Sequence, residues 1–348
     1  VTITLSSTDS QSGVSKYQYK CSGTNNQWAD AKSTDTWTAE RNGTVYYRSI
    51  DNAGNISAES STSIKIDKTA PAAPTIKNSS GGNWTNQNVT ITLSSTDSQS
   101  GVSKYQYKCS GTNNQWADAK STDTWSAERN ETVYYRAIDN AGNISAESST
   151  SIKIDKTAPT VTINRTNYSI FGWSASDAKS GVVGYAITTS SLTPTSWTAS
   201  GTLTSGTKTV TAAGTYYAWI KDAAGNVNKA SINAYTMTRS QGTGSTLTTR
   251  MDGTSASTGT PVTANVVVLS GTPVWAVATA NAGYNAPVLK NGTSALTASG
   301  TKVIITGNVT ISSSATLSTY TISYNLAGGS VATANPTSYN VTSNTITL

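Results

Sequence analysis

Residues 1–21 read VTITLSSTDSQSGVSKYQYKC, and the same letters recur at residues 89–109. The copy extends further, because residues 1–71 reappear at 89–159 with an offset of 88 throughout. Only three positions differ between the copies, and they are Thr38/Ser126, Gly43/Glu131 and Ser49/Ala137. Copying a folding unit in tandem lengthens a chain, so the pattern favours a mechanical or display role over an active site.

Within each copy, short stretches alternate apolar and polar side chains, which is the period of a half-buried β-strand. The expected strands of the first copy are 1–5, 14–21, 44–50 and 63–67. Turn sequences separate them, namely Asp9-Ser-Gln-Ser-Gly13, where the glycine is free to adopt positive φ, and Asp51-Asn-Ala-Gly-Asn55. Short strands joined by such turns predict an all-β fold built from small sandwiches.

A short linker, Asp67-Lys-Thr-Ala-Pro71, ends the first copy and recurs at 155–159. Proline fixes φ and removes a hydrogen-bond donor, so it breaks the sheet and limits the swing between neighbours. The second copy then gains an opening strand at 74–77, which the first copy lacks. The first copy is therefore either a cut fragment, which we favour, or is completed by a strand from another molecule.

A third, diverged unit spans about 159 to 240. Asp177-Ala-Lys-Ser-Gly-Val182 matches the first turn, and Asp222-Ala-Ala-Gly-Asn226 matches the second. Together with the Tyr17-Gln-Tyr19 strand and the Asp-Lys-Thr-Ala-Pro linker, these motifs resemble the bacterial immunoglobulin-like repeats of Gram-positive surface proteins. The resemblance implies tandem immunoglobulin-like β-sandwich domains, a family that serves mostly as stalk and spacer.

From Ser240 the sequence becomes rich in Gly, Ser and Thr, and we expect a hinge there. Further strands are expected at 262–269, 274–278, 302–306 and 309–311, with Gly307-Asn308 as a tight turn between the last two. Residues 320–329 and 335–339 resemble the start of a Listeria–Bacteroides repeat, a small β-grasp-like module of internalin-type surface proteins. Its usual Gly-Tyr-x-Phe-x-Gly-Trp continuation is not in this sequence, so we expect that module to be only begun.

These patterns divide the chain into five expected domains. They are 1–70 (first immunoglobulin-like repeat, opening strand missing), 71–158 (second repeat), 159–240 (third repeat), 241–318 (a β-rich module) and 319–348 (a truncated β-grasp-like repeat).

Composition narrows the function further. The chain has no histidine, which removes Ser-His-Asp and Cys-His catalysis and His-ligated zinc, and we expect no enzyme activity. Its 24 basic and 18 acidic residues form no Lys/Arg cluster, so nucleic acid is not an expected partner. There is also no run of about 20 apolar residues that would predict a membrane span.

Two cysteines, Cys21 and Cys109, occupy the same position in the two copies. Equivalent positions of consecutive domains lie a whole domain apart, whereas a disulfide needs Cα atoms within about 7 Å. We therefore expect no bond between them. Cys21 shares its strand parity with Tyr17 and Tyr19, which predicts a buried thiol.

Calcium is the one cofactor for which the sequence offers candidate ligands. If the two Asp-bearing turns of each sandwich face the preceding linker, carboxylates converge at two junctions. The first set is Asp67, Asp97 and Asp139, and the second is Asp155, Asp177 and Asp222. Calcium takes roughly six to eight oxygen ligands. Asp also closes such turns on its own backbone, and we favour that interpretation, with no cofactor.

Nine tryptophans raise the alternative of carbohydrate binding. Trp28, Trp116 and Trp197 recur in place, which favours core packing instead. Trp219 shares the parity of outward-facing Arg48 and is expected to be exposed.

The sequence is best interpreted as a stalk segment of a secreted bacterial cell-surface adhesin, located outside the cell, that displays a distal region. Its expected partners are the neighbouring domains of the same long chain. A host glycan or protein ligand would bind through regions outside this segment. The alternatives are a glycan- or matrix-binding module and a subunit of a self-assembling surface filament.

Overall fold

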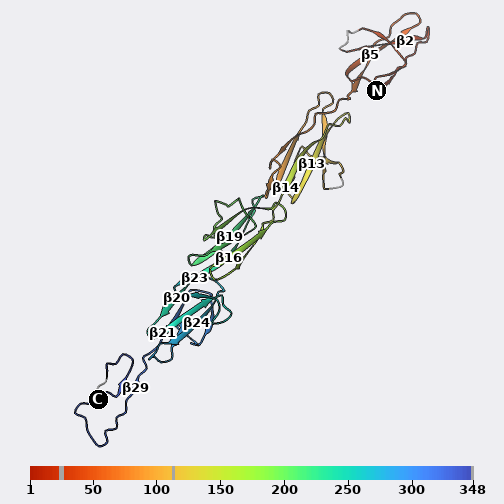
Figure 1. Ribbon diagram of the computed structural model, residues 1–348. Coiled ribbons are helices and arrows are strands. Elements are labelled where there is room, and N and C mark those ends of the chain that lie inside the picture. Colours follow the sequence, from red (N-terminus) through yellow and green to blue (C-terminus); the bar gives the residue numbers. More distant parts are fainter. Residues whose placement is uncertain (23–26, 112–113, 346–348) are drawn as a thin grey trace. The chain divides into compact units, whose positions relative to one another are not determined.

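The computed structural model describes residues 1–22, 27–111 and 114–345, and these residues form an all-β structure (Figure 1). No helix occurs among them, and hence none that could cross a membrane. The chain divides into two compact units, Val1–Lys156 and Thr157–Leu348. Unit 1 contains repeat 1 (residues 1–70) and residues 71–156 of repeat 2.

Repeat 1 is a small sandwich of two sheets. One sheet has the order β3-β2-β5-β6, and the other pairs β1 with β4. The strands are β1 (Thr2–Thr4), β2 (Val14–Cys21), β3 (Ala29–Ala31), β4 (Thr34–Thr36), β5 (Arg41–Asp51) and β6 (Ser60–Ile66). The four strands expected from alternation are thus present, and Gly13 adopts a φ of 78° in the first turn, as predicted.

Repeat 2 contains the same strands and two more. Its sheets have the orders β11-β10-β13-β14-β8 and β12-β9-β7. The strands are β7 (Thr75–Asn78), β8 (Trp84–Thr85), β9 (Val89–Ser94), β10 (Val102–Cys109), β11 (Ala117–Ala119), β12 (Thr122–Trp125), β13 (Arg129–Asp139) and β14 (Ser148–Ile154). The added strands β7 and β8 each extend one sheet at its edge.

The two repeats pack their cores to different degrees. In repeat 1 the buried cluster is Cys21, Val45, Tyr47 and Ile64. In repeat 2 it contains the four equivalents and also Val89, Ile91, Leu93 and Ile154. Cys21 and Cys109 lie buried in these separate cores, as predicted, and form no disulfide.

The prediction that Trp28 and Trp116 pack in the core is wrong. Trp37 and Trp125 take that role instead. Trp37 meets the Tyr19 ring edge-on at 5.2 Å between centroids and donates its Nε1–H to the Tyr47 hydroxyl at 3.1 Å. Trp28 stays partly exposed, because it precedes the short strand β3 on the face that carries the outward cations Lys20 and Arg48.

Unit 2 joins the third repeat and the following module through a shared sheet. A three-stranded sheet, β15-β16-β18, packs against a seven-stranded one, β17-β19-β20-β28-β25-β26 with β23 also paired to β20. These strands are β15 (Thr160–Arg165), β16 (Ile170–Ser176), β17 (Val182–Thr188), β18 (Ser205–Thr209), β19 (Gly214–Asp222), β20 (Val227–Gln241), β23 (Val266–Leu269), β25 (Val288–Asn291), β26 (Ser294–Leu296) and β28 (Val309–Ser314).

Two smaller sheets complete unit 2. One has the order β22-β21-β24-β27, and the other pairs β29 with β30. Their strands are β21 (Ser245–Met251), β22 (Thr260–Val262), β24 (Pro273–Ala280), β27 (Thr301–Ile304), β29 (Tyr320–Thr321) and β30 (Ser338–Tyr339).

The hinge expected at Ser240 is replaced by a strand. Strand β20 runs through this point, and Ser240 and Gln241 pair in parallel with Ser312 and Ser313 of β28. The Gly307-Asn308 turn also does not close a hairpin, because β27 pairs with β24 while β28 pairs with β20 and β25. The Asn308 side chain instead accepts the backbone N–H of Thr236 at 2.9 Å, which ties this loop to β20.

Candidate functional site

In each of the two Asp-bearing turns of repeat 2, the Asp carboxylate accepts hydrogen bonds from backbone N–H groups of the same turn. Asp97 Oδ1 accepts three backbone N–H groups, from Gln99, Ser100 and Gly101, at 3.1, 2.8 and 2.7 Å. This turn requires glycine at its end, where Gly101 has a φ of 79°. Local side-chain-to-backbone bonds of this kind explain why both turns recur with the same sequence.

Asp139 closes the second turn in a similar way. Its Oδ1 accepts the backbone N–H groups of Ala141 and Asn143 at 2.9 and 2.8 Å, and its Oδ2 accepts the Asn143 side-chain amide at 2.7 Å. Burial raises the pKa of Asp139, but the Asn143 side-chain and backbone hydrogen bonds outweigh it. The pKa is therefore held below its ordinary value of 3.8.

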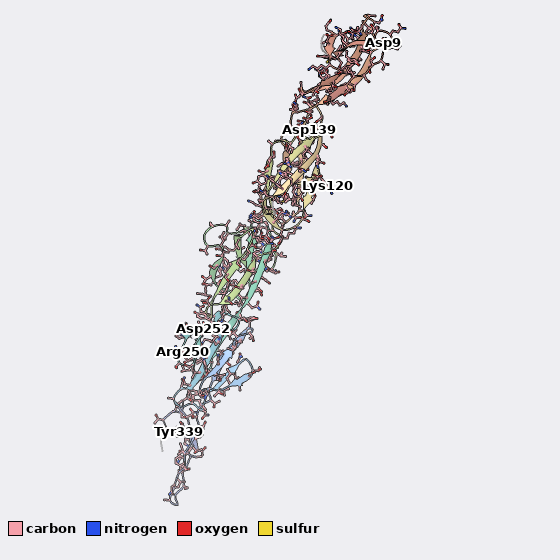
Figure 2. The ribbon with its side chains drawn as sticks, turned by 90° about the vertical axis from the view of Figure 1, so that its right-hand side faces the viewer. Asp9, Lys120, Asp139, Arg250, Asp252 and Tyr339 are labelled. Carbon is pink, nitrogen blue, oxygen red and sulfur yellow. The ribbon has the colours of Figure 1, made fainter. Side chains whose placement is uncertain are left out.

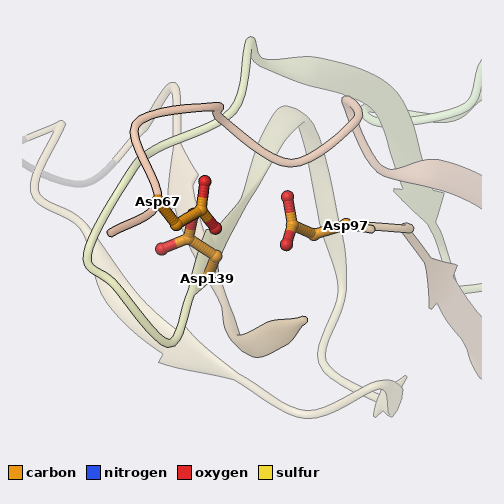
Figure 3. Close-up of side chains that lie close together, drawn as sticks. All are labelled: Asp67, Asp97 and Asp139. Carbon is orange, nitrogen blue, oxygen red and sulfur yellow. The ribbon is translucent and has the colours of Figure 1, made fainter. Parts of the chain in front are cut away.

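The linker brings a third carboxylate to these turns. Asp67 Oδ2 accepts the backbone N–H of Ser100 at 3.1 Å, and Asn143 Nδ2 donates to the Asp67 carbonyl at 3.2 Å. Asp67, Asp97 and Asp139 consequently place carboxylate oxygens within 4.8 Å of one another. Figure 3 shows the three side chains close together, and Figure 2 marks Asp139, the last residue of β13, within the whole chain. We call these three residues the acidic triad.

The acidic triad offers three carboxylates, which are ligands that calcium accepts. A cavity of about 380 Å³ lies next to it, and Asp67, Ser100 and the basic residues Arg41 and Lys65 are among its lining. The same oxygens already accept N–H donors, an arrangement that closes Asx turns without an ion. The geometry can therefore serve either role.

The second set of candidate residues is divided between the two units. In unit 1, Asp155 is fully buried and its backbone N–H bonds the Thr85 carbonyl at 3.0 Å. In unit 2, the carboxylates of Asp177 and Asp222 lie within 4.8 Å of each other and close turns of the same type, on Gly181 and Asn226. The convergence of Asp155 with the other two stays a prediction.

The recurrent tryptophans form a different cluster, on the outer face of each repeat. The Arg48 guanidinium lies 4.0 Å and the Lys20 ammonium 4.7 Å from the Trp28 ring centroid. Trp116 has the same two partners in repeat 2, at 4.1 Å from Arg136 and 4.7 Å from Lys108. These are cation–π distances, so the rings stabilise the sheet surface and are already engaged, which argues against sugar stacking on them.

Two tryptophans of unit 2 behave differently from expectation. Trp197 is partly exposed and lies 5.8 Å from the Lys221 ammonium, so its assignment to the core is wrong. Trp219, expected to be exposed, is buried, with Lys229 covering its ring at 4.4 Å. The exposure predicted from strand parity is wrong for Trp219 because the long Lys229 side chain lies across its ring.

No protein-family model matches this chain, and no curated protein matches it. Among solved structures, the chain is similar to fibronectin(III)-like modules of CbhA from Clostridium thermocellum. The identity is 19%, the match covers 43% of this chain and 82% of that chain, and the TM-score is 0.23. At this TM-score the likeness carries no argument about function. The strand orders described above define the class, which is an all-β chain of tandem β-sandwich modules.

Proposed function

We propose that this chain is a structural stalk segment of a bacterial cell-surface adhesin, which holds a distal region away from the cell. The observation that carries the proposal is the near-identity of repeats 1 and 2, each folded around its own buried cluster. Repeated modules with separate cores set length and can unfold one at a time under load. Location outside the cell agrees with the charge-poor composition, 12% Asp, Glu, Lys and Arg.

A stalk also needs joints that resist bending, and unit 1 has one between its repeats. Asn143 donates its side-chain amide to the carbonyls of Asp67 and Thr69, at 3.2 and 3.3 Å. Across the same joint, Gln99 Nε2 donates to Glu40 Oε2 at 3.2 Å. Pro71, at the end of this linker, is buried. These bonds restrict the linker more than its sequence alone would.

Unit 2 has a stiffer joint between the third repeat and the next module, because β20 is part of both. Asp252, which follows β21 (Figure 2), reinforces it. Its carboxylate pairs with the Arg165 guanidinium and accepts the Tyr168 backbone N–H at 2.6 Å. A shared strand and a partly buried ion pair transmit force without a flexible hinge, as a spacer requires.

Single-molecule force spectroscopy on the full chain tests the proposal. We expect a series of separate unfolding events, among them one with the contour length of the 88 residues 71–158 and a shorter one from residues 1–70. A chain that extends without resistance, or that unfolds in a single event at low force, would contradict a load-bearing role. Replacing Asn143 by Ala should soften the joint between the repeats without removing either unfolding event.

A further inference from the structure

The net charge of the chain lies entirely in unit 2. Unit 1 contains 15 basic and 15 acidic side chains, whereas unit 2 contains nine basic and three acidic ones, which accounts for the whole +6. The three carboxylates of unit 2 are all engaged. Asp177 and Asp222 accept backbone N–H groups of their own turns, and Asp252 pairs with Arg165. Unit 2 therefore has cations in excess of the carboxylates that could neutralise them.

Two of these cations lie among aromatic rings on the outer face of repeat 3. Alternate residues of β19 belong to the buried core, so the residues between them face outward, and these include Tyr217, Trp219 and Lys221. The Lys229 ammonium, on β20, lies 4.4 Å from the Trp219 ring centroid and 5.0 Å from that of Tyr217. Trp197 adds a third ring, 5.8 Å from the Lys221 ammonium. We call these five residues the outer platform.

Acidic side chains pair with the outer lysines of repeats 1 and 2. Lys20 forms an ion pair with Glu59 at 2.8 Å, and Lys108 forms the same pair with Glu147 at 2.8 Å. In repeat 3, neither lysine of the outer platform forms an ion pair with a described residue. The outer platform thus differs from its counterparts in having cations without a carboxylate.

Strand register shows how this difference arises. Glu59 lies one residue before Ser60, which pairs with Tyr47 of β5. In repeat 3, the residue at the same distance from the second turn as Tyr47 pairs with Ala230, and Lys229 precedes it. Repeat 3 therefore presents a cation at the position where the other two repeats supply the carboxylate.

The strand beside β19 leaves the rings of the outer platform accessible. Its outward residues are Gly184, Ala186 and Thr188, whereas the same places on β2 hold two lysines and a glutamine. Trp197 packs over Gly184, where an added Cβ would come within 3.3 Å of the Trp197 Cβ. Trp197 and Tyr217 are half-buried, so part of each ring remains in contact with solvent. Half-buried rings beside small residues form a surface on which a flat ligand can pack.

One polar group of the outer platform has no partner. Trp219 is 6% exposed, and its Nε1–H is buried and forms no hydrogen bond with a described residue. A buried donor without an acceptor costs stability, and a ligand that supplies the acceptor removes this cost. The exposed Lys229 side chain covers the ring, so a movement of its ammonium toward an anion would uncover the indole.

We propose that the outer platform binds an acidic polysaccharide, a chain of sugar rings that carry carboxylates. Trp197 and Tyr217 contact the C–H faces of the sugars, and Lys221 and Lys229 form charge-assisted hydrogen bonds with the carboxylates. Charge complementarity selects this occupant, because a neutral glycan leaves both ammonium groups without a partner. A polyanion without rings leaves the aromatic faces unused. This binding activity goes beyond the stalk function, which does not require it.

Calorimetric titration of the full chain with a galacturonic acid oligosaccharide tests the proposal. We expect saturable binding that weakens as salt rises, because salt screens exposed charges. Two other ligands separate charge from ring contact. The methyl ester of the same oligosaccharide keeps the rings without the charge, and polyglutamate of equal charge has carboxylates without sugar rings. Each should bind at least about tenfold more weakly. Equal binding of polyglutamate overturns the proposal, since the partner would then be an acidic peptide.

Substitutions in the full chain locate the site. Lys229→Glu, which restores the residue type of repeats 1 and 2, should weaken binding at least about tenfold, and Lys221→Ala should weaken it less. Lys302→Glu, on β27 in another sheet, changes the net charge equally and is the matched control, with binding within about twofold of the parent. Thermal melts show whether each variant keeps its fold. Absence of saturable binding, or equal losses for Lys229→Glu and Lys302→Glu, overturns the proposal.

Tryptophan fluorescence provides a second readout that does not depend on a charge change. Binding should alter the emission of the parent chain, because Lys229 moves off the Trp219 ring. Trp219→Phe fills the same space without the Nε1–H and should remove most of that change while the fold is kept. A ligand-induced change that is the same in Trp219→Phe and in the parent would contradict the assignment of the site to this face.

Discussion

Repeats 1 and 2 have nearly the same sequence and different cores. Val1, Ile3, Leu5 and Ile66 are exposed or half-buried, whereas Val89, Ile91, Leu93 and Ile154 are 0 to 4% exposed. None of these four positions differs between the repeats, and in repeat 2 strands β7 and β8 pair with β9 and β14 beside them. The burial of these residues therefore depends on the segments that pack against them, so identical residues in the two repeats are buried to different extents.

The largest expected effect tests this contrast directly with one substitution made twice. Ile91→Ala should destabilise repeat 2 by about 2–5 kcal/mol, the range for a fully buried isoleucine. Ile3→Ala in repeat 1 should cost less than half as much, because Ile3 is only partly buried and much of its surface already meets water.

Hydrogen exchange in increasing urea measures both repeats in one chain. Peptides that contain Gly43 or Glu131 differ in mass, so each repeat is followed separately. Equal losses for Ile91→Ala and Ile3→Ala would contradict the view that the added strands complete the core.

A smaller effect concerns Gly43 and Glu131, where the repeats do differ. In repeat 2, Glu131 pairs with Arg129 at 2.7 Å, and both side chains are largely buried. Gly43→Glu should give Arg41 the same partner and remove a flexible glycine from β5, which together stabilise repeat 1 by about 1 kcal/mol. A Cβ at this position approaches Ser22 Oγ at 3.1 Å, so the serine must move slightly.

The reverse substitution, Glu131→Gly, is the matched control and should destabilise repeat 2 by a similar amount. Thermal melts of the two variants and the parent chain provide the measurement. A Gly43→Glu chain that melts below the parent would mean that the contact with Ser22 outweighs the ion pair.

Much of the fold followed from local pattern. Alternation placed β2 at Val14–Cys21, and the Asp and Gly positions placed the turns, because these features depend on residues close in sequence. The side-by-side position of Asp67, Asp97 and Asp139 was also expected, since a sandwich brings its turns to one end.

The wrong predictions share one cause. In each case the burial or the strand pairing of a residue depends on partners that are distant in sequence. Trp28 and Trp37 both lie near short strands, and the contacts with Tyr19 and Tyr47 place Trp37 in the core. Likewise, the local sequence at Ser240 and Gln241 predicts a hinge, but these residues pair with β28, which follows about 70 residues later. Composition cannot reveal a strand whose partner is that far away.

A modest effect is expected from pH at the turns that both repeats share. Hydrogen bonds hold the pKa values of Asp139 and Asp51 below 3.8, so the folded state favours the charged forms. The resulting stability is full above about pH 4 and is lost as the pH falls through the folded-state pKa values. Asp139→Asn should flatten this acid loss in repeat 2 only, and Asp51→Asn in repeat 1 only. Melts between pH 2 and 6 check this, and an unchanged acid slope in both variants would refute it.

The smallest expected effect concerns calcium, and again the two repeats differ. The turns of repeat 2 form the acidic triad together with Asp67 of the linker, whereas the corresponding turn residues Asp9 and Asp51 of repeat 1 belong to no cluster of three carboxylates among the described residues. Because the triad oxygens already accept backbone N–H groups, we expect melting of repeat 2 to be the same in calcium and in chelator. Differential scanning calorimetry makes the comparison. A calcium-dependent rise confined to repeat 2 and abolished by Asp97→Asn would instead establish an ion site at the joint, where ion binding would stiffen the stalk.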